Sequence, residues 1–240
     1  LIDFAAEYNA PSIHVTKSRV WSLRQFYHFL TLQLSVPKSI ATGLQYPKIE
    51  KTIPQSLTHQ QYAALLEHFT ARADSAMGLR NLIIIMLLGT LGLRTRTLTG
   101  LNIEDIELTC GLLWIREKGR KHRQLVLPHC LCKIIADYLK WRRSKKGPLL
   151  LSKRNKRISA RTLQHIFQTA AQHLGIDKHL HARLFRHTAA TQLNKVAGID
   201  ITQQVLGHNR RANTLKYAHL NPDQYATYMK KHPFMKKETL

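Results

Sequence analysis

Acidic residues are scarce in this chain. Its 240 residues include 14 Asp and Glu against 37 Lys and Arg, which gives a formal net charge of +23 at pH 7 and a pI near 10.4. A basic excess of this size favours a polyanionic partner such as nucleic acid, because binding releases counterions. Composition alone also fits a ribosome-like or nonspecific basic protein.

Cysteines and long apolar runs are scarce too. Cys110, Cys130 and Cys132 form neither a CxxC pair nor an even-numbered framework, which argues against zinc and against a disulfide-stabilised secreted protein. The longest apolar run, residues 82–93, is shorter than the roughly 20 residues of a membrane span, and no signal peptide opens the chain. We therefore expect a cytoplasmic protein that needs no metal, no cofactor and no membrane.

The N-terminal part predicts a small helical unit followed by a basic linker. Apolar residues recur at helical spacing within residues 16–33, whereas prolines and lysines interrupt any periodicity from residue 35 to 54. Residue 1 is Leu rather than Met, so we expect a fragment or a trimmed product. The expected divisions are a partial helical domain at 1–46, a basic linker at 47–56, a larger domain at 57–231 and a tail at 232–240.

The larger domain is predicted to be α+β and mainly helical. Thr58 and Gln61 resemble a capping box, and the apolar run from residue 77 to 91 predicts a central helix that ends at Gly92. Short β-rich segments separated by glycines predict a small three-stranded antiparallel sheet. We expect strands at 106–108, 112–116 and 124–127, and later helices at 128–142, 160–174, 183–196, 200–206 and 213–230.

Five polar residues stand at spacings that core packing does not require: Arg94, Arg183, Arg186, His208 and Tyr217. A tyrosine hydroxyl titrates near pH 10 and is a poor nucleophile, so an enzyme that uses one must surround it and its phosphate target with fixed cations. Arginine stays charged and can hold two phosphate oxygens at once. Guanidinium and imidazole donors can therefore stabilise a phosphoryl-transfer transition state in place of a metal.

A helix that starts near residue 183 would carry Arg183 and Arg186 on one face, since they are three residues apart. Both arginines are therefore expected to face outward. The opposite face is expected to be buried and to carry Phe185, Ala189, Leu193 and Val196. Trp114, on the predicted middle strand, is expected in the core rather than as a base-stacking platform.

These motifs resemble those of the tyrosine recombinase, or phage integrase, family. The resemblance rests on Leu-Phe-Arg-His-Thr-Ala-Ala-Thr-Gln-Leu at 184–193, Leu-Gly-His at 206–208, Tyr217, and Gly-Leu-Arg at 92–94. It covers roughly residues 55–230, and the preceding segment is similar to the end of the family's core-binding domain. The fold that it implies is a helical catalytic domain with a small sheet, preceded by a short helical domain.

The resemblance also implies roles for individual residues. Arg94 and Arg186 would clamp the scissile phosphate, Tyr217 would attack it, and His208 would support it. Lys118 matches the family's hairpin lysine, which protonates the departing 5′ hydroxyl. The residues themselves agree with that role, because the like charges of Arg120, Lys121 and Arg123 should lower the pKa of the Lys118 ammonium. Lys121 is a competing candidate.

Two positions depart from the family pattern. Arg183 stands where the family most often has His, and His181 lies two places earlier. An arginine can donate to a phosphate oxygen but cannot act as a base, so we expect Arg183 to be a third clamp. Thr97 stands where an acidic residue usually orients the first arginine, and threonine cannot do this ionically.

Further basic and polar residues are candidate DNA contacts, with a solvated surface as the alternative. His187 is expected to support the neighbouring catalytic residues, while Tyr225 and Tyr228 lack the family spacing and are expected to be packing residues. The candidate DNA contacts are Arg96, Arg120, Lys121, Arg123, His187, Asn209, Arg210, Arg211 and Lys216.

The predicted function is site-specific DNA recombination, as in mobile elements, through a 3′-phosphotyrosine intermediate. By resemblance, the partner is double-stranded DNA and the working form is a homotetramer on two synapsed sites, with a monomer when free. One alternative is a type IB topoisomerase or hairpin resolvase, which shares the cleavage step. The other is a DNA-binding accessory protein whose site has decayed at Arg183 and Thr97.

Overall fold

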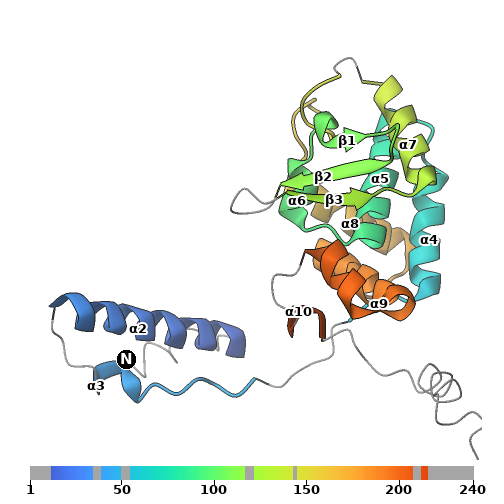
Figure 1. Ribbon diagram of the computed structural model, residues 1–240. Helices are drawn as coiled ribbons and strands as arrows, with labels where there is room; N and C mark the ends of the chain where they lie inside the picture. The colour runs from blue at the N-terminus through green and yellow to red at the C-terminus, as the bar shows by residue number, and fades with distance from the viewer. Residues whose placement is uncertain are drawn as a thin grey trace, which may run out of the picture. The chain divides into compact units, whose positions relative to one another are not determined.

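The computed structural model describes residues 12–34, 39–49, 55–116, 122–142, 145–207 and 212–215. The chain divides into two compact units, Leu1–Ile53 and Pro54–Leu240 (Figure 1). The smaller unit contains α2 (Ile13–Leu34) and α3 (Ser39–Thr42). The larger unit contains α4 (His59–Thr70), α5 (Ala76–Leu91), α6 (Thr95–Gly100), the 3-10 helix η1 (Ile103–Asp105), β1 (Ile106–Glu107), β2 (Leu112–Arg116), β3 (His122–Val126), α7 (His129–Lys140), α8 (Ala160–Leu174), α9 (Ala182–Leu206) and α10 (Ala212–Leu215).

The smaller unit is a long helix, α2, with the short helix α3 packed against it. Its core consists of Val20, Ala41 and Leu44, with Leu23 and Tyr27 packed around them. The stretch 35–54, in which the sequence shows no periodicity, therefore contains one helical turn at Ser39–Thr42, which the sequence pattern missed. The turn forms between Pro37 and Gly43 because tertiary packing buries Ala41 against α2, and a four-residue helix is too short to give a periodic signal.

Helix α5 is the centre of the larger unit and contacts α4, α7 and α9 (Figure 1). Its apolar residues Ile83, Ile84, Ile85, Leu87 and Leu88 have no exposed surface. The helix begins where the Ser75 side chain accepts a hydrogen bond from the Gly78 backbone N–H at 3.2 Å. It ends at Gly92, which is left-handed with φ 59°. The predicted central helix with a glycine stop is thus confirmed.

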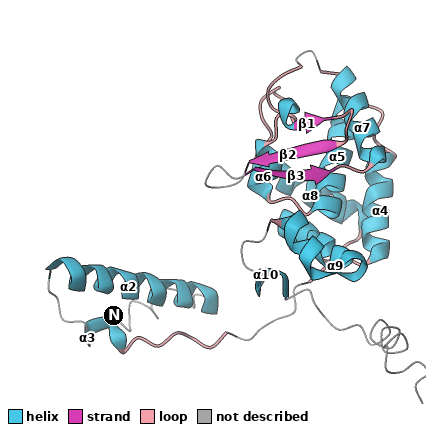
Figure 2. Ribbon diagram, in the orientation of Figure 1, coloured by secondary structure: helices cyan, strands magenta, loops and turns pink. Residues whose placement is uncertain are grey.

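The sheet is antiparallel, in the order β1-β2-β3, and Figure 2 shows the strands side by side. Side chains alternate between its faces, so that Leu113 and Ile115 are buried whereas Trp114 is 40% exposed. The prediction that Trp114 lies in the core is wrong because its neighbours take the inner face. The predicted fold class, α+β and mainly helical with a small three-stranded sheet, is confirmed.

Helix α9 contains a break that separates its two parts. Gly198 has φ 77° and ψ 179° within the helix, and the Thr202 hydroxyl donates to the Gly198 carbonyl at 2.7 Å. The predicted buried stripe is correct at Phe185 and Ala189, which are 0% and 1% exposed, but wrong at Val196, which is 90% exposed. The buried contacts of the first part therefore end before the break.

Helix caps explain several other boundaries. At the start of α4, the Gln61 N–H donates to the Thr58 hydroxyl and the Thr58 N–H donates to the Gln61 amide oxygen, both at 3.1 Å. The predicted capping box is thus confirmed. Ser159 caps α8 by accepting from the Thr162 N–H at 3.2 Å. Across the described ranges, no helix has both the length and the apolar character needed to cross a bilayer.

Candidate active site

The ends of α5 and α9 approach each other closely at Gly92. A Cβ atom on Gly92 would lie 2.6 Å from Leu206 Cδ2, which is closer than packed atoms tolerate, and 3.3 Å from Ala189 Cβ, which is a tight contact. Gly92 is also in the left-handed region, which side chains other than glycine avoid. This contact brings the segment that leads to Arg94 beside the last turn of α9.

Arg186 is buried where these two helix ends meet, with 8% of its surface exposed. Its Nη1 donates to the Gly92 carbonyl at 2.6 Å, and its Nη2 donates to the Leu206 carbonyl at 2.8 Å. The C-terminal carbonyls of a helix lack helical partners and carry partial negative charge, so they can hold a buried cation. The prediction that Arg186 faces outward is therefore wrong, because two helix ends receive its guanidinium.

Two more arginines donate to the same turn of α9. Arg94 Nη2 donates to the Gly207 carbonyl at 3.1 Å, and Arg123 Nη1, from strand β3, donates to the Gln204 carbonyl at 3.2 Å. Arg94 is exposed and Arg123 is half-buried. Guanidiniums from three separate elements thus converge on four consecutive residues, 204–207.

Arg183 lies on the exposed surface of α9, one turn before His187. Its Nε donates to His187 Nε2 at 3.3 Å, and this geometry requires an unprotonated Nε2 on the imidazole. Arg183 and His187 belong to the same helix, so the contact is local. His187 therefore contacts a catalytic candidate, and its supporting role stays a prediction.

His181 caps the start of α9. Its Nδ1 accepts from the Leu184 N–H at 3.0 Å, and its ring centroid lies 5.5 Å from that of His179. Burial lowers the pKa of His181 below 6.5, and the charges of His179 and Arg183 lower it further. Its role in the described structure is therefore to start the helix that carries Arg183 and Arg186.

The structure locates some of the predicted site residues and not others. Arg96 is exposed on α6. Within the described ranges, no three His, Cys, Asp or Glu side chains gather as metal ligands. The predicted site residues that lie outside the described residues are Lys118, Arg120, Lys121, His208, Asn209, Arg210, Arg211, Lys216 and Tyr217.

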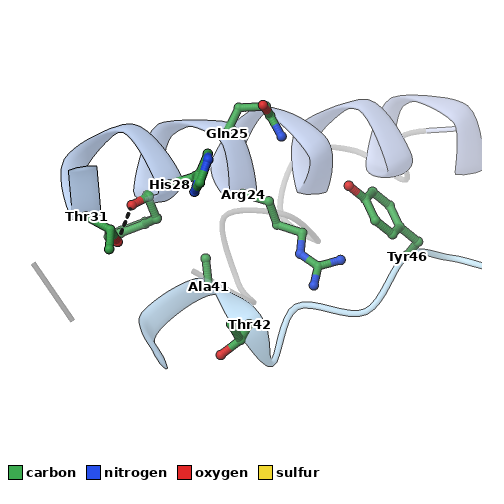
Figure 3. A pocket seen from close by; sticks show the side chains of 8 residues that line it. Arg24, Gln25, His28, Thr31, Ala41, Thr42 and Tyr46 are labelled. Carbon is green, nitrogen blue, oxygen red and sulfur yellow. Dashed lines mark hydrogen bonds between the residues drawn. The ribbon is translucent and has the colours of Figure 1, made fainter. Parts of the chain in front are cut away.

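The smaller unit has a separate basic hollow of about 280 Å³. Arg24 and Tyr46 point into the space between α2 and the segment after α3 (Figure 3). The Arg24 guanidinium lies 5.1 Å from the centroid of the Tyr46 ring, a favourable cation–π distance. His28 and Thr42 also line the hollow. The sequence pattern did not predict this pairing, because Arg24 and Tyr46 belong to different elements.

The family model described as the phage integrase family matches residues 55–224, which is more than half of the chain. The chain belongs to the phage integrase family. The matched range contains Arg94, Arg123, Arg183 and Arg186, and it extends past Tyr217. The family expected from the sequence motifs is thus confirmed.

Curated relatives of this phage integrase family member are tyrosine recombinases. Tyrosine recombinase XerC of Pelobacter propionicus is 34% identical over 216 residues, which cover 88% of this chain and 71% of the relative. XerC of Caldanaerobacter subterraneus is also 34% identical, over 94% of this chain and 64% of the relative. The chain is therefore a homologue of tyrosine-type site-specific recombinases, of which it spans about two thirds.

Solved structures of other recombinases share the fold. The structure of XerH site-specific recombinase bound to a difH substrate superposes with a TM-score of 0.76 at 19% identity, covering 95% of this chain and 68% of that one. The Tn1549 transposon integrase, in complex with a circular intermediate DNA, gives a TM-score of 0.73 at 18% identity, covering 91% and 79%. At these identities the comparison shows the fold alone. The relatives together favour a recombinase over the two alternative functions.

Proposed function

We propose that this chain acts on double-stranded DNA as a site-specific recombinase and forms a 3′-phosphotyrosine bond at Tyr217. The observation that carries the proposal is the convergence of Arg94 and Arg186 on the last turn of α9. His208 follows that turn directly, and Tyr217 comes nine residues later. DNA as the partner is supported by the DNA-bound recombinases that share the fold.

In the cleavage step, the main task of the protein is to stabilise the negative charge of the transition state. The Tyr217 oxygen bonds to phosphorus and loses its proton to water, while the bond from phosphorus to O5′ breaks and Lys118 gives O5′ a proton. Negative charge on the non-bridging oxygens is stabilised by the guanidiniums of Arg94 and Arg186. Rejoining reverses these steps with the 5′ hydroxyl of a partner strand. One phosphoester replaces another, so the chemistry requires no ATP.

The carbonyl contacts of the arginines support a preorganised clamp. A guanidinium has five N–H donors in a fixed plane, so donors on one side can hold carbonyls while others meet a phosphate. Arg186 is anchored in this way by Gly92 and Leu206. Its orientation is therefore set before DNA arrives, which lowers the reorganisation needed in the transition state.

The two departures from the family pattern have compensations in this structure. The Gly207 carbonyl receives Arg94 Nη2 at 3.1 Å, and we propose that it orients Arg94 in place of the acidic residue that Thr97 replaces. Arg183 donates to His187, and we propose that the imidazole holds Arg183 as a third phosphate clamp. These contacts support an active site over a decayed one.

Several predictions extend beyond this site and stay predictions. They are a homotetramer on synapsed DNA, a monomer when free, a cytoplasmic location, and DNA contacts at the exposed Arg96 and at the basic residues around Lys118 and Tyr217. The basic hollow around Arg24 adds a candidate phosphate contact in the smaller unit.

Covalent capture from a random pool of DNA tests the function and does not require a known target sequence. The chain is incubated with random-sequence duplexes that carry a nick, so that cleavage releases a short fragment and rejoining fails. We expect an adduct that survives denaturant, enriched in one sequence motif, and its loss in Tyr217→Phe.

Matched controls are Tyr225→Phe and Tyr228→Phe, which should retain the adduct. Two captured sites placed on separate duplexes should then yield recombinant strands. Absence of any adduct with the native chain would support a DNA-binding accessory protein instead. Relaxation of supercoiled DNA without recombinants would support a topoisomerase.

A further inference from the structure

Arg123 lies on the inner face of strand β3. It pairs with Ile115 across the sheet and alternates with Gln124 and Val126, which are exposed, while Leu125 is buried. Its side chain is therefore directed toward the body of the unit, where Nη1 donates to the Gln204 carbonyl. A cation directed inward in this way is well placed to join two elements, β3 and α9.

The partner of Arg123 belongs to the turn that the catalytic arginines also hold. The Gln204 carbonyl accepts from the Gly207 N–H at 3.1 Å, while the neighbouring carbonyls of Leu206 and Gly207 accept from Arg186 and Arg94. Arg123 thus connects the sheet to the same few residues that orient the proposed phosphate clamp. The bond spans 81 positions in sequence.

Strand β3 is one of the two edge strands of the described sheet, and the Arg123–Gln204 bond connects it to α9. In the order β1-β2-β3 it hydrogen-bonds to β2 on one side only. The preceding strand β2 is anchored at its end by a salt bridge between Arg116 and Asp105, with 3.4 Å between Nη2 and Oδ1. The hydrogen bond of Arg123 to the Gln204 carbonyl anchors β3 in the same way, one residue after the strand begins at His122.

We infer that Arg123 is a positioning residue that aligns the β2–β3 hairpin with the last turn of α9. The inference rests on the proposed function, in which Lys118, between these strands in sequence, protonates O5′. Leu206 is buried against Gly92, and Arg94 and Arg186 still hold the turn when Arg123 is lost. Removal of Arg123 therefore loosens strand β3 from α9 and leaves the clamp in place, and we expect it to impair departure of the 5′ oxygen.

The cleavage rate and the salt dependence of DNA affinity distinguish a positioning role of Arg123 from a direct phosphate contact. Arg123→Gln and Arg123→Lys are compared with the native chain in single-turnover adduct formation on a captured duplex. We expect Arg123→Gln to cleave about 10–100-fold more slowly, as for residues that orient catalytic groups, with Arg123→Lys intermediate. The dependence of DNA affinity on salt should be unchanged. A native cleavage rate at saturating DNA, with a salt slope reduced by about 1, would overturn the inference.

A substrate with sulfur in place of the bridging 5′ oxygen identifies the impaired step. A thiolate leaves without a proton when the phosphorus–sulfur bond breaks, so a defect in proton donation disappears on this substrate. We expect Arg123→Gln and Lys118→Ala to approach the native rate, whereas Arg186→Lys stays slow. If Arg123→Gln stays slow as well, Arg123 has a different role and the inference fails.

The Lys118→Ala arm distinguishes this failure from a failure of the proposed function. If Lys118→Ala stays slow on the sulfur substrate while Arg123→Gln recovers, Arg123 positions a different proton donor, such as Lys121, and the lysine assignment is wrong. Circular dichroism and thermal unfolding of Arg123→Gln should match the native chain. A misfolded variant would not recover on any substrate, so recovery also excludes general damage.

Discussion

At the scale of single residues, the buried guanidinium of Arg186 determines the geometry of the site. Sequence spacing selected Arg94 and Arg186 as candidate clamps because phosphate chemistry requires cations, and that role stays a prediction. It placed Arg186 on the wrong side of its helix, because the position depends on carbonyls of Gly92 and Leu206 that are distant in sequence. The contact of Arg123 with Gln204 was missed for the same reason. Residue type was therefore predictable, whereas hydrogen-bond partners were not.

Arg186→Lys tests whether the fork of donors matters or only the charge. A lysine ammonium cannot bridge Gly92 and Leu206 in the plane of a guanidinium, so the phosphate would lose an aligned donor. We expect single-turnover cleavage to fall by about 10²–10³-fold. A carbonyl left without its donor should also reduce the free energy of unfolding by about 1–3 kcal/mol.

Arg72→Lys is the matched control for this substitution. Arg72 is exposed and donates to the His68 carbonyl near the end of α4, away from the arginine cluster. Its cleavage rate and its urea unfolding curve should match those of the native chain. A native cleavage rate in Arg186→Lys at saturating DNA would show that Arg186 is a structural cation and not part of the clamp.

At the scale of elements, the sequence predicted features that depend on neighbouring residues but not those that depend on tertiary packing. The Thr58–Gln61 capping box and the Gly92 stop were predicted because a cap depends on residues within one turn. The exposure of Trp114 and of Val196 could not be read from hydrophobicity. Which face of a strand is covered, and how far a helix stays in contact with the core, depend on elements elsewhere in the chain.

The start of α9 should make the stability of the larger unit depend on pH. His181 must keep Nδ1 unprotonated to accept from Leu184, and burial lowers its pKa below 6.5 in the folded chain. As pH falls through about 6.5, the unfolded chain takes up this proton first. The contribution of His181 is therefore fully present above pH 6.5 and is lost toward lower pH.

His181→Asn keeps a cap acceptor and removes the titration. We expect the unfolding free energy of the variant, minus that of the native chain, to rise between pH 7 and pH 5 in chemical denaturation. Other histidines, including His68 with its lowered pKa, titrate equally in both proteins and cancel in the difference. A difference that is constant with pH would show that the cap does not titrate.

At the scale of the whole molecule, charge and fold bear on the proposed DNA partner in different ways. The net charge of +23 predicts strong, salt-sensitive attraction to a polyanion, and residues 12–49 contain no Asp or Glu at all. The fold adds what composition cannot, namely one place where fixed guanidiniums from separate elements meet. Attraction would spread over the basic surface, whereas cleavage would occur at this cluster.

The most direct test is an experimental structure of Tyr217→Phe bound to a captured duplex before cleavage. The expected result is one DNA phosphate within hydrogen-bond distance, roughly 3 Å, of Arg94, Arg183 and Arg186, with the ring of residue 217 facing its phosphorus. The contradicting result is DNA bound elsewhere, with that ring packed among apolar side chains and the arginines bonded only to carbonyls.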